Sequence, residues 1–109
     1  MDPRIRSTLT HINERFKDRL LVKDLAFRVG MHPVHFTRLF TRSTGLAPHR
    51  YVLAKKIEKA KDFITTLEET PEATSMDLGF HDYSHFYRTF KRLTGMTPSA
   101  YVKAFRKGG

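Results

Sequence analysis

Apolar residues recur at helical spacing along most of the chain. Near the N-terminus, Ile5, Leu9, Ile12 and Phe16 fall three or four positions apart, which predicts one amphipathic helix. Asp2 and the proline after it suit the cap and the first turn of that helix.

A short second helix is expected over residues 21–29, ending at Gly30. Its buried side would carry Val22, Leu25, Ala26 and Val29. A sharp turn follows, and the next helix opens at Pro33. Two helices joined by a short glycine turn are the helix-turn-helix pattern.

The stretch from His35 to Val52 returns fifty residues later, from His85 to Val102, with ten of eighteen positions identical. Self-similarity at a fixed spacing indicates a duplicated supersecondary unit. In each copy a helix stops at a glycine, Gly45 or Gly95, the residue best able to adopt the left-handed conformation past a helix end. A proline three residues later suits the first turn of the next helix.

The helix in each copy is expected to have one core side and one polar side. The core sides carry Phe36, Leu39 and Phe40 in the first copy and Phe86, Phe90 and Leu93 in the second. The opposite sides carry Val34, Thr37, Arg38 and Thr41 in the first copy and Ser84, Tyr87, Arg88 and Lys91 in the second.

From Pro48 to about Leu67 the apolar residues keep helical spacing with no glycine and no internal proline, which predicts one long helix. Its polar positions include Lys55, Lys56, Lys59 and Lys61. Twenty residues of helix span roughly 30 Å, close to the roughly 34 Å repeat of B-form DNA. Such a helix could hold two recognition helices one DNA turn apart.

After this helix, Thr70 and the proline that follows open another helix, which runs to Gly79. The final helix is expected over Pro98 to Lys107, packing through Tyr101, Val102 and Phe105, with Gly108 and Gly109 frayed. The pattern therefore predicts an all-α fold of about seven helices. The expected organisation is a first helix-turn-helix subdomain over residues 1–47, a linker helix over 48–68 and a second subdomain over 69–109.

The charge distribution indicates a polyanionic partner. The net charge is +9, and residues 25–57 and 83–109 each contain six Lys or Arg and no acid. All eleven acids lie outside these two windows, which hold the two repeat copies. An incidental charge run is the less favoured alternative, because a merely solvated surface usually mixes the two signs.

Several other classes of protein are disfavoured. Without cysteine there is no disulfide framework and no thiolate nucleophile, which fits a cytoplasmic protein. The longest apolar run has four residues, far short of the roughly 20 that span a bilayer, and no secretion signal opens the chain, so we expect no membrane association.

Histidines could in principle form a metal or catalytic site. His81 and His85, or His32 and His35, have a spacing that could share a metal, but no HExxH pattern or cysteine accompanies them. Capping and packing are the favoured roles, and we expect no metal and no cofactor. The string His81–His85 holds the residue types of a hydrolase triad without a glycine elbow, so we expect no enzyme.

The polar sides of the repeat helices carry the chemistry needed to read DNA. Arg38 and Arg88 lie mid-helix, and arginine pairs bidentately with guanine O6 and N7, so both are expected to read bases. Val34 suits a thymine methyl group, although for Val34 and Tyr87 burial against the neighbouring subdomain is the alternative. The further candidate base contacts are Thr37, Tyr83, Ser84 and Tyr87.

Phosphate contacts are expected one helical turn later. The candidates are Thr41, Arg42, Lys91 and Arg92. For Arg42 and Arg92 the alternative is an intramolecular ion pair with an acid of the preceding helix.

These residues carry a family resemblance. GFHDYSHFYRTFKRLTGMTPSAYV, from Gly79 to Val102, closely resembles the signature of the AraC/XylS family of bacterial transcription regulators, and GMHPVHFTRLFTRSTGLAPHRYV is similar to its first helix-turn-helix. The resemblance implies two helix-turn-helix subdomains on a long helix, each with a recognition helix in the major groove. Thr74 and Ser75 stand where the family usually has Ile and Ala, and Leu21 where it usually has a capping Ser or Thr.

The leading hypothesis is therefore a sequence-specific double-stranded DNA binder that regulates transcription. The alternatives are a nonspecific nucleic-acid or RNA-binding module and an adaptor whose basic face docks an acidic protein. The chain has neither the aromatic-studded strands nor the GXXG loop typical of RNA binders. RNA polymerase is a further candidate partner, and the resemblance implies an additional ligand-sensing or dimerising domain in most full-length relatives.

Overall fold

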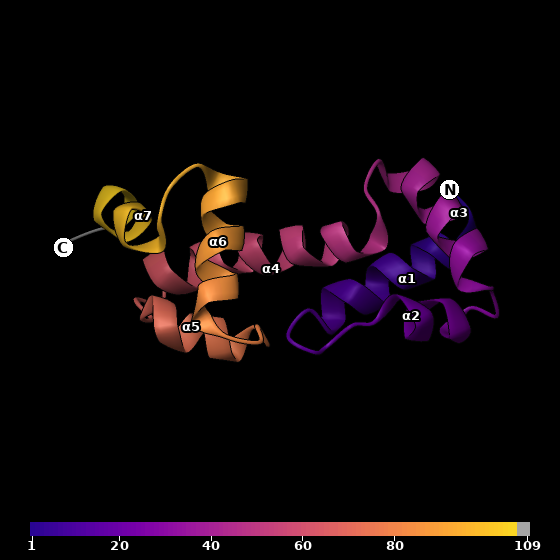
Figure 1. Cartoon of the computed structure of the whole chain (residues 1–109), viewed down its shortest axis with the longest axis horizontal. Coiled ribbons are helices and arrows are strands. Elements are labelled where there is room, and N and C mark those ends of the chain that lie inside the picture. The colour runs from indigo at the N-terminus through magenta and orange to yellow at the C-terminus, as the bar shows by residue number, and fades with distance from the viewer. Residues whose placement is uncertain (107–109) are drawn as a thin grey trace. The chain divides into compact units, whose positions relative to one another are not determined.

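The computed structural model describes residues 1–106 and is all-α over that range (Figure 1). Its helices are α1 (Pro3–Glu14), α2 (Val22–Arg28), α3 (Pro33–Thr44), α4 (Pro48–Thr65), α5 (Pro71–Asp77), α6 (Tyr83–Thr94) and α7 (Pro98–Phe105). The all-α prediction with seven helices is confirmed for this part of the chain. None of these helices is long and apolar enough to cross a bilayer.

The chain forms two compact units, Met1–Lys55 and the part from Lys56 onward, and the boundary falls inside α4. Each unit holds one helix-turn-helix pair, α2 with α3 in the first and α5 with α6 in the second. The sequence-based division into residues 1–47, 48–68 and 69–109 stays a prediction.

The first helix begins where the sequence indicates and ends earlier. The Asp2 carboxylate accepts the Arg4 backbone N–H at 2.8 Å and caps α1, as predicted. Hydrogen bonds to Arg4 hold the pKa of Asp2 at about 2. The prediction that Phe16 belongs to this helix is wrong, because the Asp18 N–H bonds to the Arg15 carbonyl and closes a turn after Glu14.

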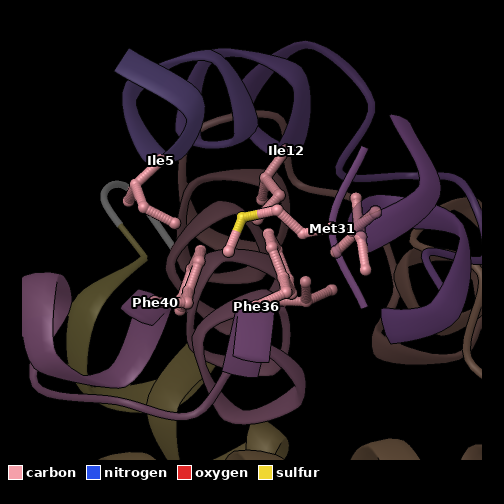
Figure 2. Packing of buried hydrophobic residues seen from close by; sticks show 8 residues of the cluster. Ile5, Ile12, Met31, Phe36 and Phe40 are labelled. Carbon is pink, nitrogen blue, oxygen red and sulfur yellow. The ribbon is translucent and has the colours of Figure 1, made fainter. Parts of the chain in front are cut away.

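The core of the first unit lies between α1, α2 and α3. Figure 2 shows Ile5 and Ile12 of α1 pointing toward Phe36 and Phe40 of α3, with Met31 beside them. Both phenylalanines have no exposed surface, and their ring centroids lie 5.7 Å apart. The remaining buried members of this core are Leu25, Ala26 and Val52. The predicted core face of α3 is therefore confirmed.

Left-handed glycines follow two helices of the first unit. Gly30 has a φ of +70° and follows α2, and Gly45 has a φ of +85° and follows α3. The predicted residues 21–29 include one residue beyond each end of α2, since Leu21 and Val29 are its caps and Leu21 makes no side-chain capping bond. Helix ends of this kind commonly differ by one or two residues from a pattern-based assignment.

The core of the second unit repeats the aromatic geometry of the first. Phe86 and Phe90 are fully buried with centroids 5.7 Å apart, and Phe90 meets Tyr101 edge-on at 5.4 Å. Leu93, predicted to be in the core, is 46% exposed. It lies in the last turn of α6, whereas the buried residues, including Thr89, lie nearer the start of that helix.

The long helix also ends before the predicted position. Its last residue is Thr65, and Leu67, expected on its apolar side, is 65% exposed. Glu68 has a φ of +54°, and the Glu69 N–H bonds back to the Phe63 carbonyl, which is a left-handed helix stop. The helix therefore ends without the glycine that usually marks such a stop.

Two basic residues of the second unit, one buried and one partly buried, bind backbone carbonyls of that unit. Lys56, expected on the polar side of α4, is only 6% exposed, and its Nζ donates to the Leu78 carbonyl at 2.6 Å. Arg106 donates from Nε and Nη2 to the Ile64 carbonyl at 3.0 and 2.6 Å, near the C-terminus of α4. Both side chains satisfy carbonyls close to helix ends, where no intrahelical donor remains.

Helices α5 and α7 begin at the predicted prolines and end before the predicted positions, since α5 stops at Asp77 rather than at Gly79. The Thr70 hydroxyl accepts the Ala73 N–H at 3.1 Å and caps α5, as predicted. The final helix α7 stops at Phe105, which is 55% exposed although it was expected to pack, while its ring stays 4.5 Å from that of Tyr101. The predicted extension to Lys107 and the frayed Gly108 and Gly109 lie outside the described residues.

Replacing Phe40 by alanine should lower the free energy of unfolding by roughly 3 to 5 kcal/mol, because the ring is fully buried against Phe36 and Tyr51. Chemical denaturation measures the change. Phe27→Ala is the matched control, since Phe27 is 85% exposed and its loss should change stability by no more than about 0.5 kcal/mol. A Phe40→Ala protein that melts within a degree or two of the parent would reverse the assignment of core and exposed faces.

Thr74→Val should stabilise the protein by about 1 kcal/mol. Thr74 is fully buried and its Oγ1 has no hydrogen-bond partner within residues 1–106, so valine keeps the shape and removes an unsatisfied hydroxyl. Thr70→Val is the control with the opposite sign, because it removes the α5 cap and should cost about 1 kcal/mol. Thermal and denaturant unfolding of both variants give the comparison, and a destabilised Thr74→Val protein would contradict the assignment.

Candidate nucleic-acid interface

The exposed side of α3 presents an arginine beside an apolar residue. Val34 is 55% exposed, and Arg38 is exposed one turn later. A shallow hollow at this end of the helix is lined by Pro33, Val34, Thr37 and Arg38. The structure thus brings together the three base-reading candidates proposed for this helix.

Capping by a histidine fixes the start of α3. The Nδ1 atom of His32 accepts the Val34 backbone N–H at 3.3 Å. The bond satisfies one of the free N–H groups of the first turn and holds Val34 in a defined position. The capping role expected for the histidines is confirmed at His32.

The phosphate candidates of α3 lie on the same exposed surface. Thr41 and Arg42 are both exposed, and the Thr41 hydroxyl donates to the Thr37 carbonyl at 2.7 Å. Its proton is therefore engaged within the helix, and the oxygen remains able to accept. Arg42 is the stronger candidate for phosphate, because its charge is free to face solvent.

The exposed side of α6 is more polar than that of α3. Ser84, Arg88, Lys91 and Arg92 are exposed, and Tyr87 is 37% exposed. Tyr83 differs from these, since its ring is half-buried 5.8 Å from that of Phe86. Burial raises the pKa of the Tyr83 phenol, which therefore stays protonated near neutral pH.

A carboxylate rather than a histidine caps α6. Asp82 accepts the His85 backbone N–H at 2.7 Å, and this bond holds the pKa of the Asp82 carboxyl below its usual value. His85 packs its ring against Phe80 at 5.3 Å, which confirms the packing role expected for a histidine. The sequence analysis considered Asp82 only as part of a triad-like string and not as a cap, although an aspartate directly before a helix is a common cap.

The alternative of intramolecular ion pairs is not supported for the arginines of the two faces. Within residues 1–106, neither Arg42 nor Arg92 pairs with an acid. Lys56 and Arg106, which also belong to the acid-free windows, instead donate to backbone carbonyls. The windows therefore offer fewer cations to a partner than their sequence suggests. Lys56 and Arg106 lie fifty residues apart, at equivalent positions of the repeat. This equivalence can be read from the sequence.

These two faces are suited to binding a polyanion with exposed base edges. They combine unpaired guanidinium groups with hydroxyls and one apolar hollow on rigid helices. Among the described residues no group of three His, Asp or Glu side chains is placed to hold a metal ion.

Comparison with known sequences identifies the family. The family described as "Helix-turn-helix domain" matches residues 25–104. The chain is 33% identical over 78 residues to the uncharacterized HTH-type transcriptional regulator YobQ of Bacillus subtilis (strain 168), covering 72% of this chain and 32% of that protein. It is 37% identical over 59 residues to the HTH-type transcriptional regulator Rv1931c of Mycobacterium tuberculosis (strain ATCC 25618 / H37Rv), covering 54% of this chain and 23% of that protein. The chain thus spans about a third or less of the length of these relatives.

Solved structures agree with this assignment. The C-terminal domain of AraT, a response regulator from Geobacillus stearothermophilus, has the same fold, with a TM-score of 0.92, 20% identity and coverage of 96% of this chain and 88% of that one. The DNA-binding domain of AdpA, a global transcriptional factor solved with a target DNA, superposes with a TM-score of 0.88 and 25% identity, covering 95% and 93%. The chain therefore belongs to the AraC-type helix-turn-helix DNA-binding domains of bacterial transcription regulators, a non-enzymatic family that binds DNA sequence-specifically through two helix-turn-helix motifs.

Proposed function

We propose that α3 and α6 each read base edges in the major groove, in two segments of one site about one DNA turn apart. The observation that carries the proposal is the pair Arg38 and Arg88. These residues are equivalent in the repeat and exposed at the middle of their helices, and neither forms a salt bridge among residues 1–106, although Asp82 lies close enough to Arg88 to attract it. Arginine in that setting can form the bidentate pair with guanine that gives the commonest specific contact.

The other residues of the two faces divide by position along each helix. Residues near the helix start and middle are assigned to bases: Val34, Thr37, Arg38, Tyr83, Ser84, Tyr87 and Arg88. Residues one turn later are assigned to phosphate: Thr41, Arg42, Lys91 and Arg92. This order follows the docking of helix-turn-helix proteins, in which the N-terminal part of the recognition helix contacts base edges. Tyr83 is the weakest base-reading candidate, because half of its ring packs into the core.

The organisation and partners of the whole protein are part of the proposal. Residues 1–47 and 69–109 would act as the two DNA-binding subdomains, with residues 48–68 setting the distance between them. Because the curated relatives are about three times as long or longer, an effector-sensing or dimerising domain outside this chain is the expected partner. RNA polymerase is a second one, and the bacterial cytoplasm, where the chromosome lies, is the expected location.

A mobility-shift assay tests the function directly. The protein should shift a duplex selected from a random pool at much lower concentration than a scrambled duplex of equal length and salt concentration. Equal affinity for the two duplexes would favour a nonspecific nucleic-acid module. Binding to neither would favour an adaptor for an acidic protein.

Affinity for DNA should fall steeply with salt. If both faces together neutralise roughly 6 to 10 phosphates, the logarithm of affinity should fall against the logarithm of salt concentration with a slope of about −5 to −9. Fluorescence anisotropy over a series of salt concentrations measures the slope. The slope is also compared between two variants. Lys91→Ala removes a proposed phosphate contact of α6, and Lys103→Ala, in the same acid-free window but in α7, is its matched control. A parent slope shallower than about −3 would contradict contact by both faces.

Loss of either arginine should have a local effect on specificity. Arg38→Ala should cost about 1 to 3 kcal/mol of binding free energy and relax the base preference in one segment, and Arg88→Ala should do so in the other. Arg92→Ala is the control, because loss of a phosphate contact should weaken all sequences roughly alike. The measurement is a base-by-base substitution scan of a bound site with each variant. An unchanged preference at every position in Arg38→Ala would remove the direct-readout role of α3.

A further inference from the structure

The hollow at the start of α3 is mainly a carbon surface with a charged edge. It is lined by Pro33, Val34, Thr37 and Arg38. The proline, valine and threonine among these residues carry ring or methyl carbon, and Arg38 is the charged residue that lines the hollow. Val34 has 55% of its surface exposed, so its methyl groups lie open to water.

Helix geometry places the guanidinium group of Arg38 next to the hollow. Val34 and Arg38 are four residues apart, so they lie on one face, and long side chains on a helix lean toward its N-terminus. The Arg38 side chain therefore extends toward Val34. Successive bases of one DNA strand are stacked roughly 3.4 Å apart, a spacing at which the two side chains can contact neighbouring bases.

The equivalent position on α6 has no aliphatic side chain at the place of Val34, and the apolar surface near it is aromatic, because the rings of Tyr83 and Tyr87 lie 6.3 Å apart. Ser84 replaces Val34 and Tyr87 replaces Thr37, whereas Arg88 keeps the arginine. A serine hydroxyl can donate to or accept from several bases, but it offers no surface that gains from burying a methyl group. The two recognition helices thus share a guanine reader and differ in what stands beside it.

We propose that the hollow at Val34 receives the C5-methyl group of a pyrimidine next to the guanine paired with Arg38. The inference rests on the base-reading role proposed for α3 and names the chemistry of its second subsite. Thymine carries this methyl group in the major groove, and 5-methylcytosine presents the same group, whereas cytosine and uracil do not. Binding is therefore sensitive to methylation of a cytosine at that position.

Single replacement of each thymine in a selected duplex by deoxyuridine tests the proposal, since it removes one methyl and keeps every hydrogen-bonding group. At one position in the α3 segment the parent should bind about 3- to 10-fold more weakly, the effect expected from leaving one methyl unburied. Val34→Ser should bind the thymine and uracil duplexes equally at that position. Ser84→Val is the reciprocal variant and should gain a thymine preference in the α6 segment. Circular dichroism verifies that each variant is folded.

A second arm separates the methyl group from the rest of thymine. With cytosine placed at the sensitive position, its 5-methylation should strengthen binding by a similar factor, about 3- to 10-fold, in the parent and not in Val34→Ser. A preference for thymine over uracil without any response to 5-methylcytosine would overturn the claim that the methyl group alone is recognised.

The possible failures are distinguishable. If no uracil substitution weakens binding while Arg38→Ala still relaxes a guanine preference, the methyl subsite is wrong and base reading by α3 stands. If neither change alters specificity, α3 does not read bases, and the proposed function fails together with the subsite.

Discussion

Aromatic packing beneath each recognition helix determines which face of that helix is available to DNA. Phe36 and Phe40 are buried on one side of α3, and the edge of the Tyr51 ring closes against Phe40 at 5.4 Å. Each ring buries a large apolar area, so rotating α3 about its axis would expose these rings to water at a cost of several kcal/mol. The direction in which Arg38 points is therefore fixed by residues on the opposite side of the helix.

The same constraint operates in the second unit with nearly identical geometry. Phe90 and Tyr101 repeat the edge-on contact at the same 5.4 Å, and Phe86 and Phe90 repeat the 5.7 Å separation. The exposed residues of α3 and α6 differ far more than these core residues. A duplicated unit that keeps its core and changes its surface can present two different sets of contacts from one scaffold. On the proposed function, this division lets one chain read two unlike DNA segments.

Most of the fold and the exposed arginines of the candidate site were predictable, because local signals and tertiary packing agree over most of the chain. The capping residue Thr70 and the left-handed Gly45 mark helix boundaries that the sequence alone indicates. The errors lie where the folded chain overrides the local pattern. Leu67 continues the apolar spacing of α4, but the left-handed Glu68 ends the helix. A hydropathy pattern places the charged end of Lys56 in solvent. In the structure its Nζ donates to a carbonyl 22 positions away, a contact that a short sequence window cannot detect.

The residues that cap α3 and α6 differ in charge, and this difference affects which part of each helix is suited to contact DNA. α6 begins behind Asp82, whose carboxylate is kept ionised by the N–H bond from His85 and favours the helix through its dipole. The same negative charge attracts Arg88 and repels phosphate. α3 begins behind His32, where an imidazole nitrogen rather than a carboxylate accepts the Val34 N–H, so this cap places no negative charge at the start of the helix. On the proposed function, the start of α3 is therefore better suited to a short-range contact, such as that between the apolar hollow and the methyl group of a base. The helix α6 is better suited to contact bases through its middle, where Tyr87 and Arg88 lie.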